Sequence, residues 1–300
     1  MSSTAASRPL VGIFWMFVTG VFFIMVTALV KYMGPRLPAP EAAFIRYGLG
    51  LVFLIPSLGT IRSAQITTRQ WSLFGMRGLF HAGGVALWFF AMTRIPIAEV
   101  TAMNYLAPIY VTVGAAIFLG EKLAMRRIFA VVMGLAGAAI ILRPGFREVS
   151  LGHLAMLMAG FVFAGSYLIA KVLADEAKPG VIVGMLSVFV TIGLAPLAIP
   201  VWITPTWEEL AILSAVAIFA TSGHYTMTLA FAAAPVTVTQ PVTFLQLVWA
   251  TALGAVAFAE PVDIWVIIGG FVILASVTFI TWREAVLKRQ ITPVSNATKL

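Results

Sequence analysis

The sequence predicts an all-α integral membrane protein with about ten transmembrane helices arranged as two inverted five-helix repeats. Three observations lead to this fold class: the composition, a series of long apolar runs, and an internal repeat. Of the 300 residues, 61% are hydrophobic and only 10% are charged, whereas soluble domains carry roughly a quarter charged residues. Such a chain lacks the polar groups to cover a surface in water. In a bilayer the surrounding lipid is apolar, so the outer surface can be apolar as well.

The apolar runs have the length that a bilayer requires, about 20 residues for each helix. They cover residues 10–33, 42–58, 71–93, 98–119, 128–142, 151–173, 181–202, 210–231, 236–259 and 264–282. Some runs end at helix-stopping groups such as Gly34-Pro35. The first run is too long for a signal peptide and lacks a small-residue cleavage site. Residues 1–8 and 288–300 are expected to form short cytoplasmic tails.

The basic residues between the runs predict the orientation. If the N-terminus is cytoplasmic, roughly 12 Lys and Arg fall on the cytoplasmic side and roughly 5 on the outer side. This bias predicts a multi-pass protein of the inner (plasma) membrane with both termini in the cytoplasm. It also explains the formal charge of +8. The expected partners are therefore the lipid bilayer and a small solute, with no nucleic acid and no obligatory protein partner.

An internal repeat aligns the two halves of the chain at an offset of about 140 residues, which later becomes 139. The aligned pairs include Gly12/Gly152, Phe23/Phe163, Lys31/Lys171, Pro56/Pro196, Gly83/Gly223, Pro96/Pro235 and Glu121/Glu260. The predicted repeats are residues 9–143 and 150–282. Because each holds an odd number of spans, the second copy is expected to be inverted. Many secondary transporters share this plan, with the substrate site near the midplane between the halves.

A family resemblance is carried by residues 78–123, which begin GLFHAGG and end FLGEKL, and by the Gly-rich segment IFAVVMGLAGAAIIL that follows. Together they resemble the EamA unit of the drug/metabolite transporter superfamily. Residues 229–262 form a looser copy that keeps Glu260 but has no match for Pro108. Arg46 also lies where the family has an arginine early in its second helix. The resemblance covers nearly the whole chain outside the tails, and the most similar group is the YddG-like exporters of aromatic and neutral amino acids.

The candidate substrate-binding residues share helix faces within the spans. In the third and fourth spans His81 and Trp88, and Thr101 and Asn104, recur at helical spacing. Polar groups in spans mark solute pathways, although they also serve as hydrogen-bonding links between helices, and the sequence leaves both readings open. The predicted substrate-binding set is His81, Trp88, Thr101, Asn104, Tyr105, Pro108, Tyr167, Thr221, His224, Gln240, Thr243 and Gln246. Arg46 and Arg77, by contrast, are expected to snorkel to the membrane interface.

Missing motifs narrow the chemistry. The chain has no cysteine, and its three histidines fit no zinc or hydrolase motif. We therefore predict no catalytic residues, no metal and no cofactor, and not an enzyme. The middle of each span lacks a carboxylate, which disfavours a cationic substrate.

The expected function is export of small metabolites, above all aromatic or neutral amino acids. Transport would follow alternating access through a central cavity between the repeats. The alternatives are a nucleobase, sugar or drug transporter of the same superfamily, a channel, or an intramembrane enzyme.

Overall fold

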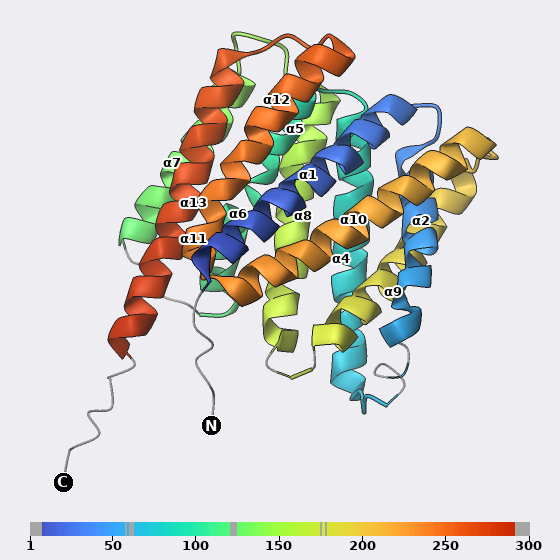
Figure 1. Ribbon diagram of the computed structural model, residues 1–300, viewed down its shortest axis with the longest axis horizontal. Coiled ribbons are helices and arrows are strands. Elements are labelled where there is room, and N and C mark those ends of the chain that lie inside the picture. Colours follow the sequence, from blue (N-terminus) through green and yellow to red (C-terminus); the bar gives the residue numbers. More distant parts are fainter. Residues whose placement is uncertain are drawn as a thin grey trace.

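The computed structural model describes residues 8–57, 59, 63–120, 125–174, 176–177 and 179–291. These residues form a bundle of helices (Figure 1). The elements are α1 (Pro9–Met33), α2 (Ala39–Gly50), the 3-10 helix η1 (Leu51–Ser57), α4 (Thr68–Met92), α5 (Ile97–Asn104), α6 (Ala107–Phe118), α7 (Met125–Leu142), α8 (Leu151–Ala174), α9 (Pro179–Ala198), η2 (Ile199–Val201), α10 (Trp207–Ala233), α11 (Val236–Thr239), η3 (Gln240–Thr243), α12 (Phe244–Phe258) and α13 (Ile264–Ile291). The predicted all-α fold class is confirmed.

Most of the expected spans are present, with changes at their ends. Among the described residues, nine stretches are long and apolar enough to cross a membrane. The second expected span is not among them because its α-helix, α2, has only 12 residues and continues as η1. The last helix, α13, continues to Ile291, beyond the tail boundary expected at residue 288. Residues 1–7 and 292–300 of the expected tails lie outside the described residues.

Equivalent capping boxes begin the third and eighth spans. The Thr67 hydroxyl accepts a hydrogen bond from the Gln70 N–H, and the Gln70 side chain accepts one from the Thr67 N–H. Thr206 and Glu209, 139 residues further on, repeat this arrangement at the start of α10. Each box satisfies N–H groups that a helix start leaves without partners. The local sequence T-x-x-Q/E therefore fixes where both helices begin.

The fourth and ninth spans are both interrupted near their middle. The fourth is divided into α5 and α6, because Pro108 has no N–H for the carbonyl of Asn104. The ninth passes through α11 and η3 before α12 begins. The Tyr105 hydroxyl donates to the Thr243 carbonyl over 2.8 Å and so joins the two interruptions.

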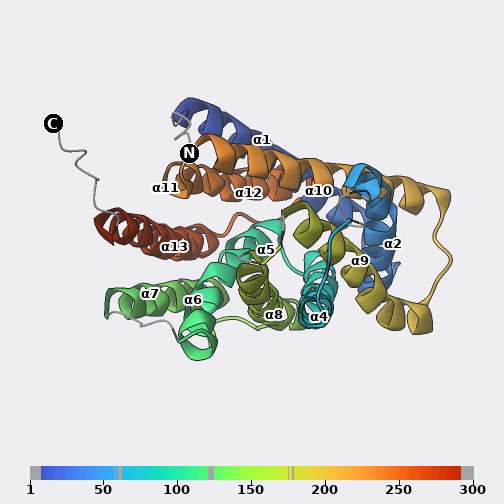
Figure 2. The same ribbon diagram turned by 90° about the horizontal axis from the view of Figure 1, so that it is seen from below.

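The two repeats exchange helices rather than packing as separate halves. The first helix of one repeat, α1, packs along α10 of the other, and α8 packs along α4 in the equivalent way. Viewed along the bundle, α1, α10 and α12 form one layer, while α8, α4 and α6 form the other (Figure 2). A side chain at Gly223 of α10 would meet Phe23 of α1, and one at Gly84 of α4 would meet Phe163 of α8. These glycines therefore permit both close crossings.

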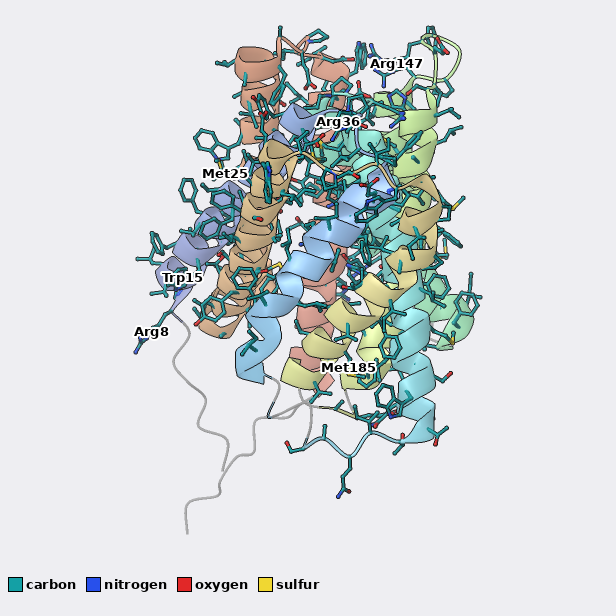
Figure 3. The ribbon with its side chains drawn as sticks, turned by 90° about the vertical axis from the view of Figure 1, so that its right-hand side faces the viewer. Arg8, Trp15, Met25, Arg36, Arg147 and Met185 are labelled. Atoms are coloured by element: carbon teal, nitrogen blue, oxygen red, sulfur yellow. The ribbon has the colours of Figure 1, made fainter. Side chains whose placement is uncertain are left out.

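The direction of the helices confirms that the repeats are inverted. Helix α1 begins and α13 ends at one end of the bundle, which we call the terminal face (Figure 1). Helix α8 begins at the opposite end, which we call the distal face. Arg36 and Arg147 lie near the distal face and Arg8 near the terminal face (Figure 3). The equivalent helices α1 and α8 therefore run in opposite directions.

Candidate solute-binding cavity

A central cavity of about 310 Å³ lies between the two layers of helices. Its volume is at the lower end of the range for small-molecule pockets, roughly 300–1,000 Å³. Rings dominate its wall: Phe23, Tyr47, His81, Trp88, Phe89, Tyr105, Phe163, Tyr167 and His224. The polar lining residues are Thr27, Arg46, Thr101, Asn104 and Gln246. Among the lining residues that the structure describes, none is Asp or Glu.

Most of the residues predicted from the sequence line this cavity. They are His81, Trp88, Thr101, Asn104, Tyr105, Tyr167, His224 and Gln246. Pro108 instead lines a second cavity of about 360 Å³, which shares Tyr167 with the first and includes Arg127 and Lys171. Thr221 and Thr243 are half-buried and lie outside both linings. The side chain of Gln240 is outside the part of the structure that is described.

Arg46 and Tyr47 of α2 were missed as cavity residues. Arg46 was expected at the membrane interface, but it lies in the cavity wall beside Tyr47. Arg77 is also not at the interface: its side chain is buried, and one guanidinium nitrogen donates to the Ile182 carbonyl over 3.0 Å. The signal available in the sequence was a charged residue within an apolar run, which marks a functional position by default.

His81 lies within a group of rings that we call the ring cluster: Tyr47, His81, Phe163 and Tyr167. The His81 ring is edge-on to Phe163 at 5.0 Å, and to Tyr47 and Tyr167 at 6.4 Å each. Phe163 and Tyr167 stack at 6.1 Å with an interplanar angle of 18°. Aromatic groups favour such edge-to-face and offset geometries because of their quadrupoles. The cluster therefore offers ring faces and edges for another flat group.

A side chain at Gly84 would meet the ring of Phe163. The glycine thus lets Phe163 lie close against α4, beside His81. On the polar side of His81, its Nδ1 lies 3.3 Å from the Ser166 hydroxyl. His81 is therefore held between the packed ring of Phe163 on one side and the hydroxyl of Ser166 on the other.

The opposite side of the cavity holds a related but simpler pair, which also joins one residue from each repeat. Phe23, the equivalent of Phe163, is edge-on to His224 at 5.2 Å. A side chain at Gly223, next to His224, would meet Phe23. Each repeat therefore contributes a phenylalanine and a histidine to the cavity. The repeat equivalents of Arg46, Tyr47 and Tyr167 are Leu186, Ser187 and Thr27, so this side of the cavity carries fewer rings and no cation.

Polar links join the helix ends at the distal face. Lys31 forms an ion pair with Glu260 over 2.8 Å and donates a hydrogen bond to the Ile95 carbonyl, also over 2.8 Å. The other Glu260 oxygen accepts the Ile97 N–H over 2.8 Å. These contacts tie the end of α1 to the loop after α12 and to the start of α5. They give Glu260 a structural role.

A second distal group centres on Glu99, whose side chain is buried. Arg147 donates to both carboxylate oxygens over 2.9 and 2.8 Å. The His153 Nε2 lies 2.5 Å from one of them. The Ser150 N–H donates to His153 Nδ1 over 3.0 Å, so Nε2 is the nitrogen that carries the proton. The hydrogen bond to Glu99 raises the pKa of Arg147, which keeps this arginine charged.

Several features together define a membrane transporter fold: inverted repeats, interrupted helices in both repeats, and a cavity between them. The model of the EamA-like transporter family matches the chain over residues 10–143 and again over 150–282. The chain belongs to this family.

Curated relatives agree with this assignment. A riboflavin transporter of Vibrio cholerae is 28% identical over 290 residues, covering 94% of this chain and 97% of the relative. An S-adenosylmethionine uptake transporter of Rickettsia prowazekii is 26% identical, covering 91% and 93%. A pseudopaline exporter of Pseudomonas aeruginosa is 24% identical, covering 85% and 90%. The superfamily resemblance is thus confirmed, whereas these relatives do not support the narrower likeness to YddG-like amino-acid exporters.

A solved crystal structure has the same fold. It covers 95% of this chain and 99% of its own, with a TM-score of 0.57 at 18% sequence identity. At this identity the match shows the fold alone.

Proposed function

We propose that the protein is a secondary transporter whose solute carries a planar ring, moved by alternating access. The observation that carries this proposal is the composition of the central cavity, which is rich in rings and has no carboxylate among its described lining residues. Stacking on one aromatic side chain contributes about 0.5–1.5 kcal/mol beyond burial. The ring cluster offers several such contacts to one solute.

Two substrate classes fit this cavity. The first is the flavins and nucleoside-like compounds, because relatives along most of the chain are named for riboflavin and S-adenosylmethionine. The second is the aromatic amino acids, the class expected from the sequence. Arg46 supports the second class because it places a cation in the cavity wall. Polyamines and quaternary cations are disfavoured, since the described lining offers them no carboxylate.

The orientation and direction of transport are part of the proposal. We place the protein in the inner membrane with the terminal face toward the cytoplasm, following the bias of basic residues. The ion pairs Lys31–Glu260 and Glu99–Arg147 join helix ends at the distal face, and we propose that they close this face, so that the cavity opens toward the cytoplasm in this conformation. Export remains the predicted direction, although the relatives include both an uptake transporter and an exporter.

Flux into proteoliposomes tests the proposal. The purified protein is reconstituted and offered labelled riboflavin, tryptophan, leucine and spermidine in parallel, with protein-free liposomes as the blank. We expect saturable movement of at least one ring-bearing solute, and little movement of leucine or spermidine. Equal transport of leucine or spermidine would reject the ring-based reading, and flux that never saturates would indicate a channel.

Thiol labelling tests whether the cavity admits water. Because the chain has no cysteine, single cysteines can be introduced without further changes. Cysteine at the exposed, cavity-lining Asn104 should react with a small hydrophilic thiol reagent. Its neighbour Met103, which is 0% exposed, is the matched control and should stay unreactive. Equal reactivity at both positions would contradict the described cavity.

A further inference from the structure

We propose that Arg46 binds an oxyanion of the solute, so that the substrate is a ring-bearing acid or zwitterion rather than a neutral ring compound. This inference rests on the proposed function and narrows its substrate class. The oxyanion is a carboxylate or a phosphate, since both present oxygen pairs that match a guanidinium.

The first support is the position of Arg46. It lies in α2, is half-buried, and lines the central cavity. Its guanidinium carbon is 4.0 Å from the centroid of the Tyr47 ring. No other Lys or Arg is among the described lining residues of this cavity, and no carboxylate is there to neutralise it.

The second support is a comparison with four arginines outside the cavity, while the buried Arg77 is satisfied by the Ile182 carbonyl. Arg36, Arg69, Arg143 and Arg147 each form an ion pair with a carboxylate. For Arg46, the described part of the chain provides only the ring of Tyr47. A cation within a membrane span is expensive unless it is paired. An anionic solute entering the cavity would supply the missing charge.

The third support is the geometry of the ring cluster. The guanidinium covers Tyr47, the Tyr47 ring is edge-on to His81, and His81 is edge-on to Phe163. A cation therefore stands at the edge of a continuous set of rings. A solute whose oxyanion lies a few bonds from a flat ring matches this arrangement, because both groups are satisfied at once.

Comparison of the two repeats shows that the cation and its ring are present on one side of the cavity only. The repeat equivalents of Arg46 and Tyr47 are Leu186 and Ser187 of α9. The equivalent side of the fold therefore has neither the cation nor the ring. A ring-bearing acid would bind in one orientation, with its oxyanion toward α2.

Arg94 provides a matched control for substitution. Its guanidinium also lies over a ring, that of Phe90, at 3.6 Å. It does not line the central cavity, and it donates to the Phe90 carbonyl and the Thr93 hydroxyl. Arg94→Gln thus removes a cation–π contact of the same kind without changing the proposed site.

The test is calorimetric binding to the full-length protein in detergent. The probes are tryptophan and tryptophanamide, flavin mononucleotide and riboflavin, and leucine as an acid without a ring. We expect tryptophan to bind about tenfold more tightly than tryptophanamide, or flavin mononucleotide about tenfold more tightly than riboflavin. A charge-assisted bidentate contact with the oxyanion predicts a difference of this size. Which pair shows the preference identifies carboxylate or phosphate as the group recognised.

In Arg46→Gln that preference should fall to within about twofold, while affinity for the partner lacking the oxyanion is kept. That retained affinity also shows that the variant is folded. Arg46→Lys should keep part of the preference, and Arg94→Gln all of it. If wild type binds both members of each pair alike, or Arg46→Gln keeps the full preference, the inference is wrong and the ring proposal stands.

Failure of the proposed function gives a different result. Leucine binding as tightly as tryptophan, with the same dependence on Arg46, would reject the ring proposal and support the oxyanion site. Binding of none of the five probes would overturn both.

Discussion

The two sides of the cavity share a frame but differ in their side chains. Each side holds a phenylalanine from one repeat against a histidine from the other, Phe163 with His81 and Phe23 with His224. Only the side formed by α2, α4 and α8 adds Arg46, Tyr47 and Tyr167. An inverted repeat needs similar backbones so that the two halves can exchange conformations. The difference indicates that backbone symmetry is kept for movement, while side-chain asymmetry is available to orient a solute.

The two faces of the bundle show a similar contrast in their ion pairs. Arg36 pairs with Glu209 at the distal face, and Glu176 pairs with Arg69 in the equivalent contact. Residues 36 and 176, and residues 69 and 209, are both 140 apart, one more than the offset of the capping boxes. The two ion pairs therefore join equivalent regions of the repeats, with their charges exchanged. The two ion pairs differ in burial, because the Glu209 side chain is 10% exposed and the Glu176 side chain is 29% exposed.

Substitution of Glu99 should give the largest effect. Glu99→Gln breaks a buried, bidentate ion pair with Arg147 and leaves that cation with only the more distant carboxylate of Asp263, 3.8 Å away. We expect a loss of about 3 kcal/mol in the free energy of unfolding, measured by chemical denaturation in detergent. Glu176→Gln, at a more exposed pair, should cost at most about 1 kcal/mol. Equal losses would show that burial does not distinguish the pairs.

The two phenylalanines test the asymmetry of the cavity. Phe163→Ala removes a ring that contacts both His81 and Tyr167, whereas Phe23→Ala removes one that contacts His224. Transport of the ring-bearing solute should fall about tenfold for Phe163→Ala and about threefold for Phe23→Ala, given about 0.5–1.5 kcal/mol for each aromatic contact. Initial rates in proteoliposomes, corrected for reconstituted protein, measure both. A larger loss at Phe23 would reverse the assignment of the two sides.

The equivalent capping boxes should show a smaller difference. Thr67→Ala and Thr206→Ala each remove one helix cap and should cost about 1 kcal/mol of unfolding free energy. The cost should be greater at Thr206, because its partner Glu209 also holds Arg36. Thr204→Ala is the control, because Thr204 contacts Arg36 through its carbonyl and not through its side chain. A larger loss at Thr67 would contradict this ranking.

The smallest effect is expected in the coupling energies of the exchanged ion pairs. Double-mutant cycles with Gln should give well under 1 kcal/mol for Arg69–Glu176, because both partners are partly exposed. The coupling for Arg36–Glu209 should be larger and less sensitive to salt, since Glu209 is mostly buried. Repeating the unfolding measurements at low and high ionic strength provides the check. Identical couplings at both salt concentrations would remove the contrast between the faces.

Local sequence signals predicted the elements of the fold. Gly34-Pro35 marked the end of α1, and the pattern T-x-x-Q/E at Thr67 and Thr206 lies where helices begin in the structure. Helical spacing also selected His81, Asn104 and other lining residues. The expectation that Arg46 lies at the membrane interface was wrong. A position near the end of an apolar run does not show whether the side chain faces lipid or another helix.

The sequence by itself determined the membrane class, the approximate positions of the spans, the repeat offset, and many residues of the cavity wall. These properties depend on hydrophobicity and periodicity, which act over one or two helices. Only the tertiary structure decided that α1 packs on α10 and α8 on α4, and that Arg46 stands beside the ring cluster. In a membrane every outer helix face is apolar, so hydrophobicity cannot select the partner. Close packing at small residues such as Gly84 and Gly223 against a neighbouring helix makes that choice.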